Sequence, residues 1–63
     1  MLWSELSEEE KRKRMLKVVE KAKEMEVCDI FQLFREMNPD ITITLKQFYD
    51  YFLYLEEKGE IEV

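Results

Sequence analysis

Residues 44–63 (TLKQFYDYFLYLEEKGEIEV) constrain the fold more than any other stretch, because they contain both the start and the stop signal of one helix. Thr44 and Gln47 have the spacing of a capping box, and Gly59 stands where a left-handed residue commonly ends a helix. The apolar residues between these signals recur at helical spacing, with Tyr49 and Glu56 at the borders of their face: Leu45, Phe48, Phe52 and Leu55. The alternation at 60–63 is typical of an edge strand. We therefore predict a helix over residues 45–58 and a strand over 60–63.

Two further helices precede this one. Ser7 and Glu10 form a second capping-box pattern, which predicts a helix over residues 8–26. Its expected buried stripe consists of Met15, Val18, Val19, Ala22 and Met25. A helix over residues 29–37 follows and ends before Pro39, because the residue before a proline avoids helical geometry. Its expected inward residues are Ile30, Leu33, Phe34 and Met37.

The segments between the helices leave several alternatives open. Residues 1–7 form a lead-in, in which Trp3 and Leu6 either fold back as a hydrophobic lid or anchor a partner. Val27 and Cys28 are an apolar step that could form a single strand bridge, and Cys28 is expected to be a small buried hydrophobic residue. The β-branched residues at 41–44 favour an extended backbone, which either pairs with residues 60–63 or runs as a loop.

The 63 residues allow one domain at most, and a core of this size supplies only about 3–5 kcal/mol by itself. One Gly and one Pro leave few tight turns, so the expected fold is mainly α: a three-helix bundle with a minimal terminal strand or two-stranded ribbon. We expect the helices to pack around Val18, Ala22, Ile30, Phe34, Phe48, Phe52 and Leu55. The Lys-, Glu-, Arg- and Ile-rich composition is typical of thermophile proteins.

Several functional classes are disfavoured by the composition. One Cys and no His exclude an internal disulfide and a Cys/His zinc site, and we expect no metal and no cofactor. No nucleophile–base pair and no Gly-rich phosphate loop are present, so we do not expect an enzyme. No signal peptide and no apolar run long enough for a membrane span are found, so we expect a cytoplasmic protein without membrane association.

Charge is unevenly distributed along the chain, whose net charge is −5. Residues 11–27 contain seven basic and three acidic residues and form the only positive region. Its basic run at 11–14 has acidic residues four positions earlier, at Glu8, Glu9 and Glu10, and such pairs stabilise a helix by roughly 0.2–0.5 kcal/mol each. The run is therefore either a solvated, ion-paired helix face or a phosphate-binding patch.

The end of the third helix resembles the helix-turn-helix core of winged-helix domains. In that family the third helix closes with a Leu, charged residues, a Gly and an apolar residue that begins the wing. Leu55, Glu56, Glu57, Lys58, Gly59 and Ile61 match this pattern. The resemblance covers about residues 8–63. The long link between the second and third helices departs from it, and the chain stops where a second wing strand should follow, so the resemblance is to a wingless or truncated form.

The resemblance implies a small DNA-binding or transcription-associated protein whose third helix enters the major groove of double-stranded DNA. The expected nucleic-acid contacts, which add the basic outer face of the first helix, are Lys13, Arg14, Lys17, Lys21, Thr44, Lys46 and Gln47. Acidic residues on the outward face of the third helix would repel phosphates. The alternative is a protein–protein interaction module on the same scaffold, with a possible homodimer. Its expected interface residues are Tyr51, Leu53, Tyr54 and Glu57.

Overall fold

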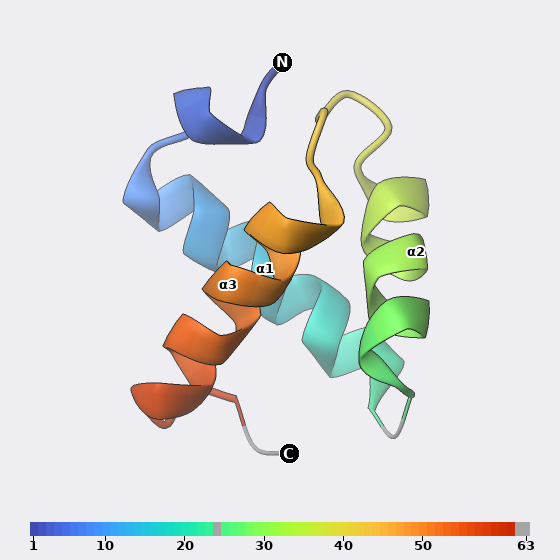
Figure 1. Cartoon of the computed structure of the whole chain (residues 1–63), viewed down its shortest axis with the longest axis vertical. Coiled ribbons are helices and arrows are strands. Elements are labelled where there is room, and N and C mark those ends of the chain that lie inside the picture. The colour runs from blue at the N-terminus through green and yellow to red at the C-terminus, as the bar shows by residue number, and fades with distance from the viewer. Residues whose placement is uncertain (24, 62–63) are drawn as a thin grey trace.

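Helices dominate the computed structural model, which describes residues 1–23 and 25–61. A short 3-10 helix, η1 (Trp3–Glu5), is followed by α1 (Glu8–Ala22), α2 (Val27–Met37) and α3 (Leu45–Glu57). In Figure 1, α3 crosses in front of α1, and α2 runs along one side of both. No strand forms within the described ranges, so the mainly α class is confirmed at this level.

α1 begins as predicted and ends a turn early. The Ser7 hydroxyl accepts a hydrogen bond from the backbone N–H of Glu10 at 3.2 Å, which caps the helix. Lys23 takes a positive φ of 48° and ends α1 after Ala22, so the predicted extension to residue 26 is wrong. Met25 consequently leaves the predicted buried stripe and is exposed. The early end lets the chain turn back so that α2 can pack its apolar face against α1.

α2 begins at Val27, two residues earlier than predicted. Val27 and Cys28 therefore form its first turn and not a strand bridge. Cys28 is exposed, which corrects the expectation of a buried residue, because it lies about 160° around the helix from the buried Ile30. The helix ends at Met37 as predicted. Asn38 follows, is buried, and donates from its side-chain amide to the Phe34 carbonyl at 3.0 Å.

The signals read for α3 act as predicted. The Thr44 hydroxyl accepts from the N–H of Gln47, and the Gln47 side chain accepts from the N–H of Thr44, both at 3.1 Å. At the other end Gly59 has a φ of 77°. The N–H groups of Gly59 and Glu60 donate to the carbonyls of Glu56 and Leu55, both at 3.0 Å, which is a Schellman cap. Glu60 and Ile61 do not form the predicted strand, and the rest of that prediction, at 62–63, lies outside the described residues.

The extended segment at 41–44 pairs with the N-terminal segment. The N–H of Thr42 donates to the Met1 carbonyl at 2.7 Å, and the N–H of Trp3 donates to the Thr42 carbonyl at 3.0 Å. Leu2 and Thr42 thereby form an isolated parallel bridge. For the predicted alternative of pairing with 60–63, Glu60 and Ile61 form no strand, and residues 62–63 lie outside the described residues. The segment runs as an extended loop into α3, which was the other predicted alternative, but its bridge to the N-terminal segment was not predicted. Pairing occurs because Ile41 and Ile43 both point into the core and leave the Thr42 backbone at the edge.

The core contains all seven residues predicted to form it and adds the N-terminal lid. Trp3 is only 4% exposed, and its ring makes edge-on contacts with Phe34 and Tyr51 at centroid distances of 5.6 and 5.4 Å. The lid is therefore part of the folded body. The buried hydrophobic set is Trp3, Leu6, Met15, Val18, Ala22, Ile30, Phe34, Ile41, Ile43, Phe48, Phe52, Leu55 and Ile61. None of the helices in the described ranges has both the length and the apolarity needed to cross a bilayer.

Candidate interaction surfaces

A row of lysines follows one side of α1. Lys13, Lys17 and Lys21 are spaced four residues apart and are exposed, so they share one stripe of the helix. Together with Met37 and Asn38 at the end of α2, they line a shallow groove. No ion pair joins these three lysines to an acidic residue of the described ranges. The row is the strongest candidate for contact with anions.

Arg14 lies beside this row but has a structural role. Its guanidinium donates to the Asn38 side-chain oxygen at 2.7 Å and forms ion pairs with Glu10 at 3.3 Å and Asp40 at 3.4 Å. These contacts connect α1 to the segment between α2 and α3. Arg14 therefore has three partners within the domain and is less available to a ligand than the lysines around it.

Only one of the three i,i+4 pairs predicted at the start of α1 forms, the pair of Glu10 and Arg14. Arg12 instead pairs with Glu60 beyond the end of α3. Glu8 accepts a hydrogen bond from the Tyr51 hydroxyl at 3.0 Å. Contacts across the fold thus replace the local pairs, because α1 and α3 cross here.

The predicted contacts at the start of α3 bind one another. Thr44 and Gln47 exchange the two capping-box hydrogen bonds. The Lys46 ammonium donates to the Asp50 carboxylate at 2.8 Å, and this hydrogen bond raises the pKa of Lys46. Lys46 also borders a groove whose lining is almost entirely apolar, so a cation here meets hydrophobic neighbours.

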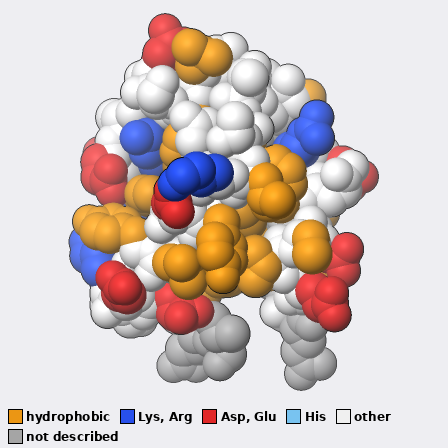
Figure 2. Space-filling view, in the orientation of Figure 1, with side chains coloured by type: hydrophobic (Ala, Val, Ile, Leu, Met, Phe, Trp, Pro, Cys, Tyr) orange, Lys and Arg blue, Asp and Glu red, His pale blue; other side chains and the backbone are white. Residues whose placement is uncertain are grey.

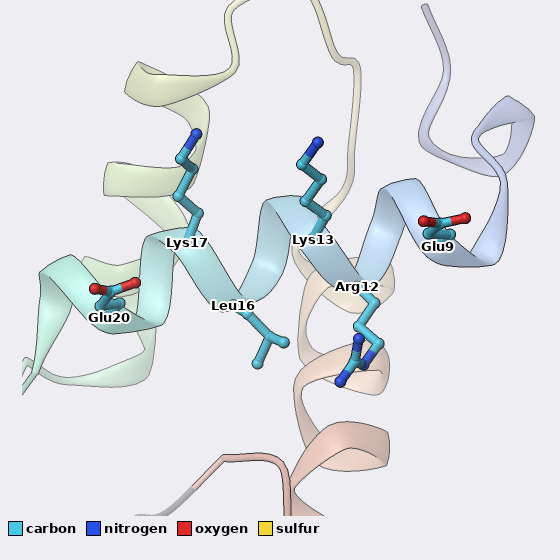
Figure 3. Close-up of a pocket in the computed structure, with 6 residues that line it drawn as sticks. All are labelled: Glu9, Arg12, Lys13, Leu16, Lys17 and Glu20. Atoms are coloured by element: carbon cyan, nitrogen blue, oxygen red, sulfur yellow. The ribbon is translucent and has the colours of Figure 1, made fainter.

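The structure does not bring the two halves of the predicted DNA surface together. The lysine row lines a groove at the C-terminal end of α2, whereas Lys46 lies against its N-terminal end, near Val27 and Cys28. In Figure 3 α1 lies in front of α3, and Lys13 and Lys17 point to one side of α1 whereas Arg12 and Leu16 point to the other. In Figure 1 α3 lies in front of α1. The two basic elements belong to different faces of the molecule.

The residues of the predicted protein interface have different environments. Tyr51 packs against the core, beside Trp3, and does not lie on the outward face expected for it. Burial, followed by the hydrogen bond to Glu8, raises the pKa of the Tyr51 hydroxyl. Tyr54 is 43% exposed but has the Lys58 ammonium 5.0 Å from its ring centroid. Leu53 is 37% exposed, and Glu57 is also exposed.

A different set of side chains forms an exposed apolar stripe on α3. Leu45 is 52% and Tyr49 46% exposed, and with Leu53 they occupy every fourth position of the helix. Val27 and Cys28, in the first turn of α2, line a groove together with Leu45 and Tyr49. We call these five residues the α3 apolar face. Figure 2 shows hydrophobic side chains gathered over α3 and toward the lower end of α2 on the viewed side.

Leu45 was expected in the buried stripe of α3 and Tyr49 at its border, although the sequence contains a signal against this. At about 100° per residue, the apolar side chains of α3 other than the exposed Tyr54 extend over roughly 200°, from Tyr51 around to Leu53. A helix on the surface of a small domain needs a stripe only somewhat wider than about 100° to reach its core. Because the apolar arc of α3 is wider than the surface that the core can cover, one edge of the arc must remain exposed to solvent. The edge that remains is Leu45, Tyr49 and Leu53.

Within the described ranges, no group of His, Cys, Asp and Glu side chains could hold a metal ion. The grooves are shallow and open. The candidate sites are therefore surfaces that could bind a macromolecule: the lysine row on α1 and the α3 apolar face. No family model, curated protein or solved structure matches this chain, and the resemblance to winged-helix domains rests on its sequence pattern alone.

Proposed function

We propose that this chain is a protein-interaction module that binds through the α3 apolar face. The observation that carries the proposal is the exposure of Leu45, Tyr49 and Leu53 along a single stripe of α3. Leu and Tyr side chains in contact with water are unfavourable by about 25 cal/mol for each Å² of apolar surface, and a partner that covers the stripe recovers this free energy. Contiguous exposed apolar surface of this kind marks interaction sites on small proteins.

The neighbouring residues favour a protein as the partner. Tyr is enriched at protein interfaces, where its ring contributes large contact area with few rotatable bonds. Lys46 and Asp50 form an exposed ion pair beside the stripe, in the position of the polar rim that surrounds the apolar centre of an interface. The acidic residues Asp50 and Glu57 on this side of α3 disfavour a nucleic-acid backbone there.

Site-specific photo-crosslinking tests this function in the cells that express the protein. A crosslinking residue at position 53 should give discrete protein adducts, whereas the same residue at Glu20, which is exposed on α1, should not. Adding Tyr49→Asp should abolish the adducts without lowering the helix content measured by circular dichroism. Identical adduct patterns from positions 53 and 20 would refute the proposal.

DNA binding is the second candidate, and the lysine row on α1 favours it, because none of its members forms an ion pair with an acidic residue of the described ranges. Lys13, Lys17 and Lys21 could contact successive phosphates, and each contact would make binding more salt-dependent. The start of α3 would not share this surface, so the expected mode is non-specific backbone binding by α1. Replacing Lys17 and Lys21 by Glu should abolish duplex binding, while Tyr49→Asp should leave it unchanged. Binding that is insensitive to salt or to the double replacement would exclude this function.

A further inference from the structure

We infer that the occupant of the α3 apolar face is a second copy of this chain, with the two α3 helices packed antiparallel across a twofold axis. This inference rests on the interaction function proposed above and specifies its partner. In a twofold dimer both copies use the same surface, so that surface must be complementary to itself. Two features of α3 meet this condition.

The first feature is the symmetry of the apolar stripe about its centre. Leu45 and Leu53 lie one turn before and one turn after Tyr49, at distances of about 6 Å along the helix axis. An antiparallel pair centred on Tyr49 sets Leu45 of each copy against Leu53 of the other. The two Tyr49 rings then meet at the axis. All three exposed apolar side chains are thereby covered by equivalent residues.

The second feature is the charge pattern beside the stripe. Lys46 and Asp50 lie on one flank of it, and the antiparallel twofold arrangement brings this same flank of both helices together in reversed order. The charges along the seam then follow the order Lys46, Asp50, Asp50, Lys46, with residues alternating between the copies. Each carboxylate lies near the ammonium of its own chain, which is 2.8 Å away in the monomer, and near that of the second copy. Opposite charges therefore meet at both ends of the seam, on either side of the two Asp50 carboxylates at its centre.

The same pattern disfavours a parallel pair. A twofold axis parallel to the helices brings opposite flanks together, which sets Glu57 of one copy near Glu56 of the other. Like charges in an interface oppose association. The charges thus select the antiparallel orientation, whereas the apolar stripe alone would permit both.

The expected dimer is weak, because one helix face and the first turn of α2 provide less than the roughly 800 Å² per partner of a standard interface. The entire described surface measures 4584 Å². We expect a dissociation constant on the order of 10 µM. Cys28 lines the groove, so its thiol should react with an aromatic disulfide reagent more slowly as the protein concentration rises through this range.

Charge reversal on α3 tests the geometry by sedimentation equilibrium. Lys46→Glu gives an acidic flank and Asp50→Lys a basic one, so each variant alone should self-associate at least about tenfold more weakly than the parent. An equimolar mixture of the two should form a heterodimer tighter than either homodimer, because the acidic and basic flanks meet only if both copies use this face. Glu20→Lys, the same charge change as Asp50→Lys but on α1, should leave dimerisation unchanged.

A mixture that associates no more strongly than its components would overturn the inference, as would a parent chain that stays monomeric at millimolar concentration. The photo-crosslinking residue at position 53 distinguishes a failure of the dimer inference from a failure of the proposed interaction function. An adduct of twice the chain mass supports the second copy. Adducts with other proteins alone would leave the interaction function standing and refute the dimer, and no adduct above the control at position 20 would refute both.

Discussion

Trp3 should contribute more to stability than its place in a short N-terminal segment suggests. It is 4% exposed and packs edge-on against Phe34 and Tyr51. Burial of an aromatic side chain removes about 150–250 Å² from water, which at 25 cal/mol per Å² gives an upper value of roughly 4–6 kcal/mol. Large-to-alanine replacements in cores agree, at about 3–5 kcal/mol. A chain of this length has a total unfolding free energy of only about 3–9 kcal/mol. Trp3→Ala should therefore remove about 3–5 kcal/mol of this total, which unfolds most of the protein at 25 °C if the total lies at the lower end of its range.

Urea denaturation followed by far-ultraviolet circular dichroism measures this effect. Trp3→Phe keeps an aromatic ring in the site and should remain folded, with a lower urea midpoint than the parent. It therefore provides a measurable loss of unfolding free energy if Trp3→Ala is too unstable to show a folded baseline. Trp3 is the only tryptophan, so its fluorescence in the parent reports on the lid alone. The fluorescence and dichroism transitions should coincide. A Trp3→Ala variant within about 1 kcal/mol of the parent, or a fluorescence transition that precedes helix loss, would refute the assignment of Trp3 to the cooperative core.

Three further predictions concern the cap of α3, the buried amide and the phenol. Gly59→Ala should lower the unfolding free energy by about 1 kcal/mol. The φ of Gly59 is 77° and an added Cβ meets no atom within 4 Å, so only backbone strain contributes. Gly59→Asn should lower the unfolding free energy less, and equal urea midpoints for the parent and both variants would contradict a left-handed cap. Asn38→Ala should lower it by about 1–3 kcal/mol, because Arg14 loses its 2.7 Å acceptor, and an unchanged midpoint would show that this contact does not stabilise the fold. The raised pKa of Tyr51, due first to burial and then to its hydrogen bond with Glu8, means that its neutral form stabilises the folded state. That contribution is complete below the ordinary tyrosine pKa of about 10 and is lost as the pH rises toward the higher folded-state value. Subtracting the absorbance titration of Tyr51→Phe from that of the parent isolates the ionisation of the Tyr51 hydroxyl. A titration midpoint near pH 10 for this hydroxyl would contradict its burial and its hydrogen bond with Glu8. A midpoint that Glu8→Gln fails to lower would contradict the hydrogen bond.

The local signals of the sequence predicted the elements well. The Ser7 and Thr44 side chains each accept a hydrogen bond from a backbone N–H three residues away, so these residues mark the starts of α1 and α3 without any information from the rest of the fold. Of these two residues, only Thr44 also makes the reciprocal bond of a capping box, from its backbone N–H to the Gln47 side chain. Gly59 marks the end of α3 for a similar reason, because a left-handed residue is needed there and Gly adopts it without steric strain. α1 ends at Ala22, and the residue after it that takes a positive φ is Lys23 and not a Gly, so no sequence signal marks that boundary and it was missed.

The candidate surfaces could be predicted only in part. The exposure of Lys13, Lys17 and Lys21 follows from their shared stripe on an amphipathic helix, which the sequence contains. Which edge of the wide apolar arc of α3 lies in solvent does not follow from it. Trp3 covers the edge at Tyr51 and leaves Leu45 and Tyr49 exposed.

Residue spacing and hydrogen bonds between near neighbours were enough to predict the three helices, the starts of α1 and α3, the cap at the end of α3 and the seven central core residues. Which segments far apart in the chain meet depends instead on how the whole chain packs. Thr42 pairs with the N-terminal segment and not with Glu60 or Ile61. Arg12 pairs with Glu60 and not with an acid on its own helix. The free-energy differences between such alternatives are small, since an exposed ion pair contributes about 0–1 kcal/mol in either place. The packing of the larger apolar side chains selects among them.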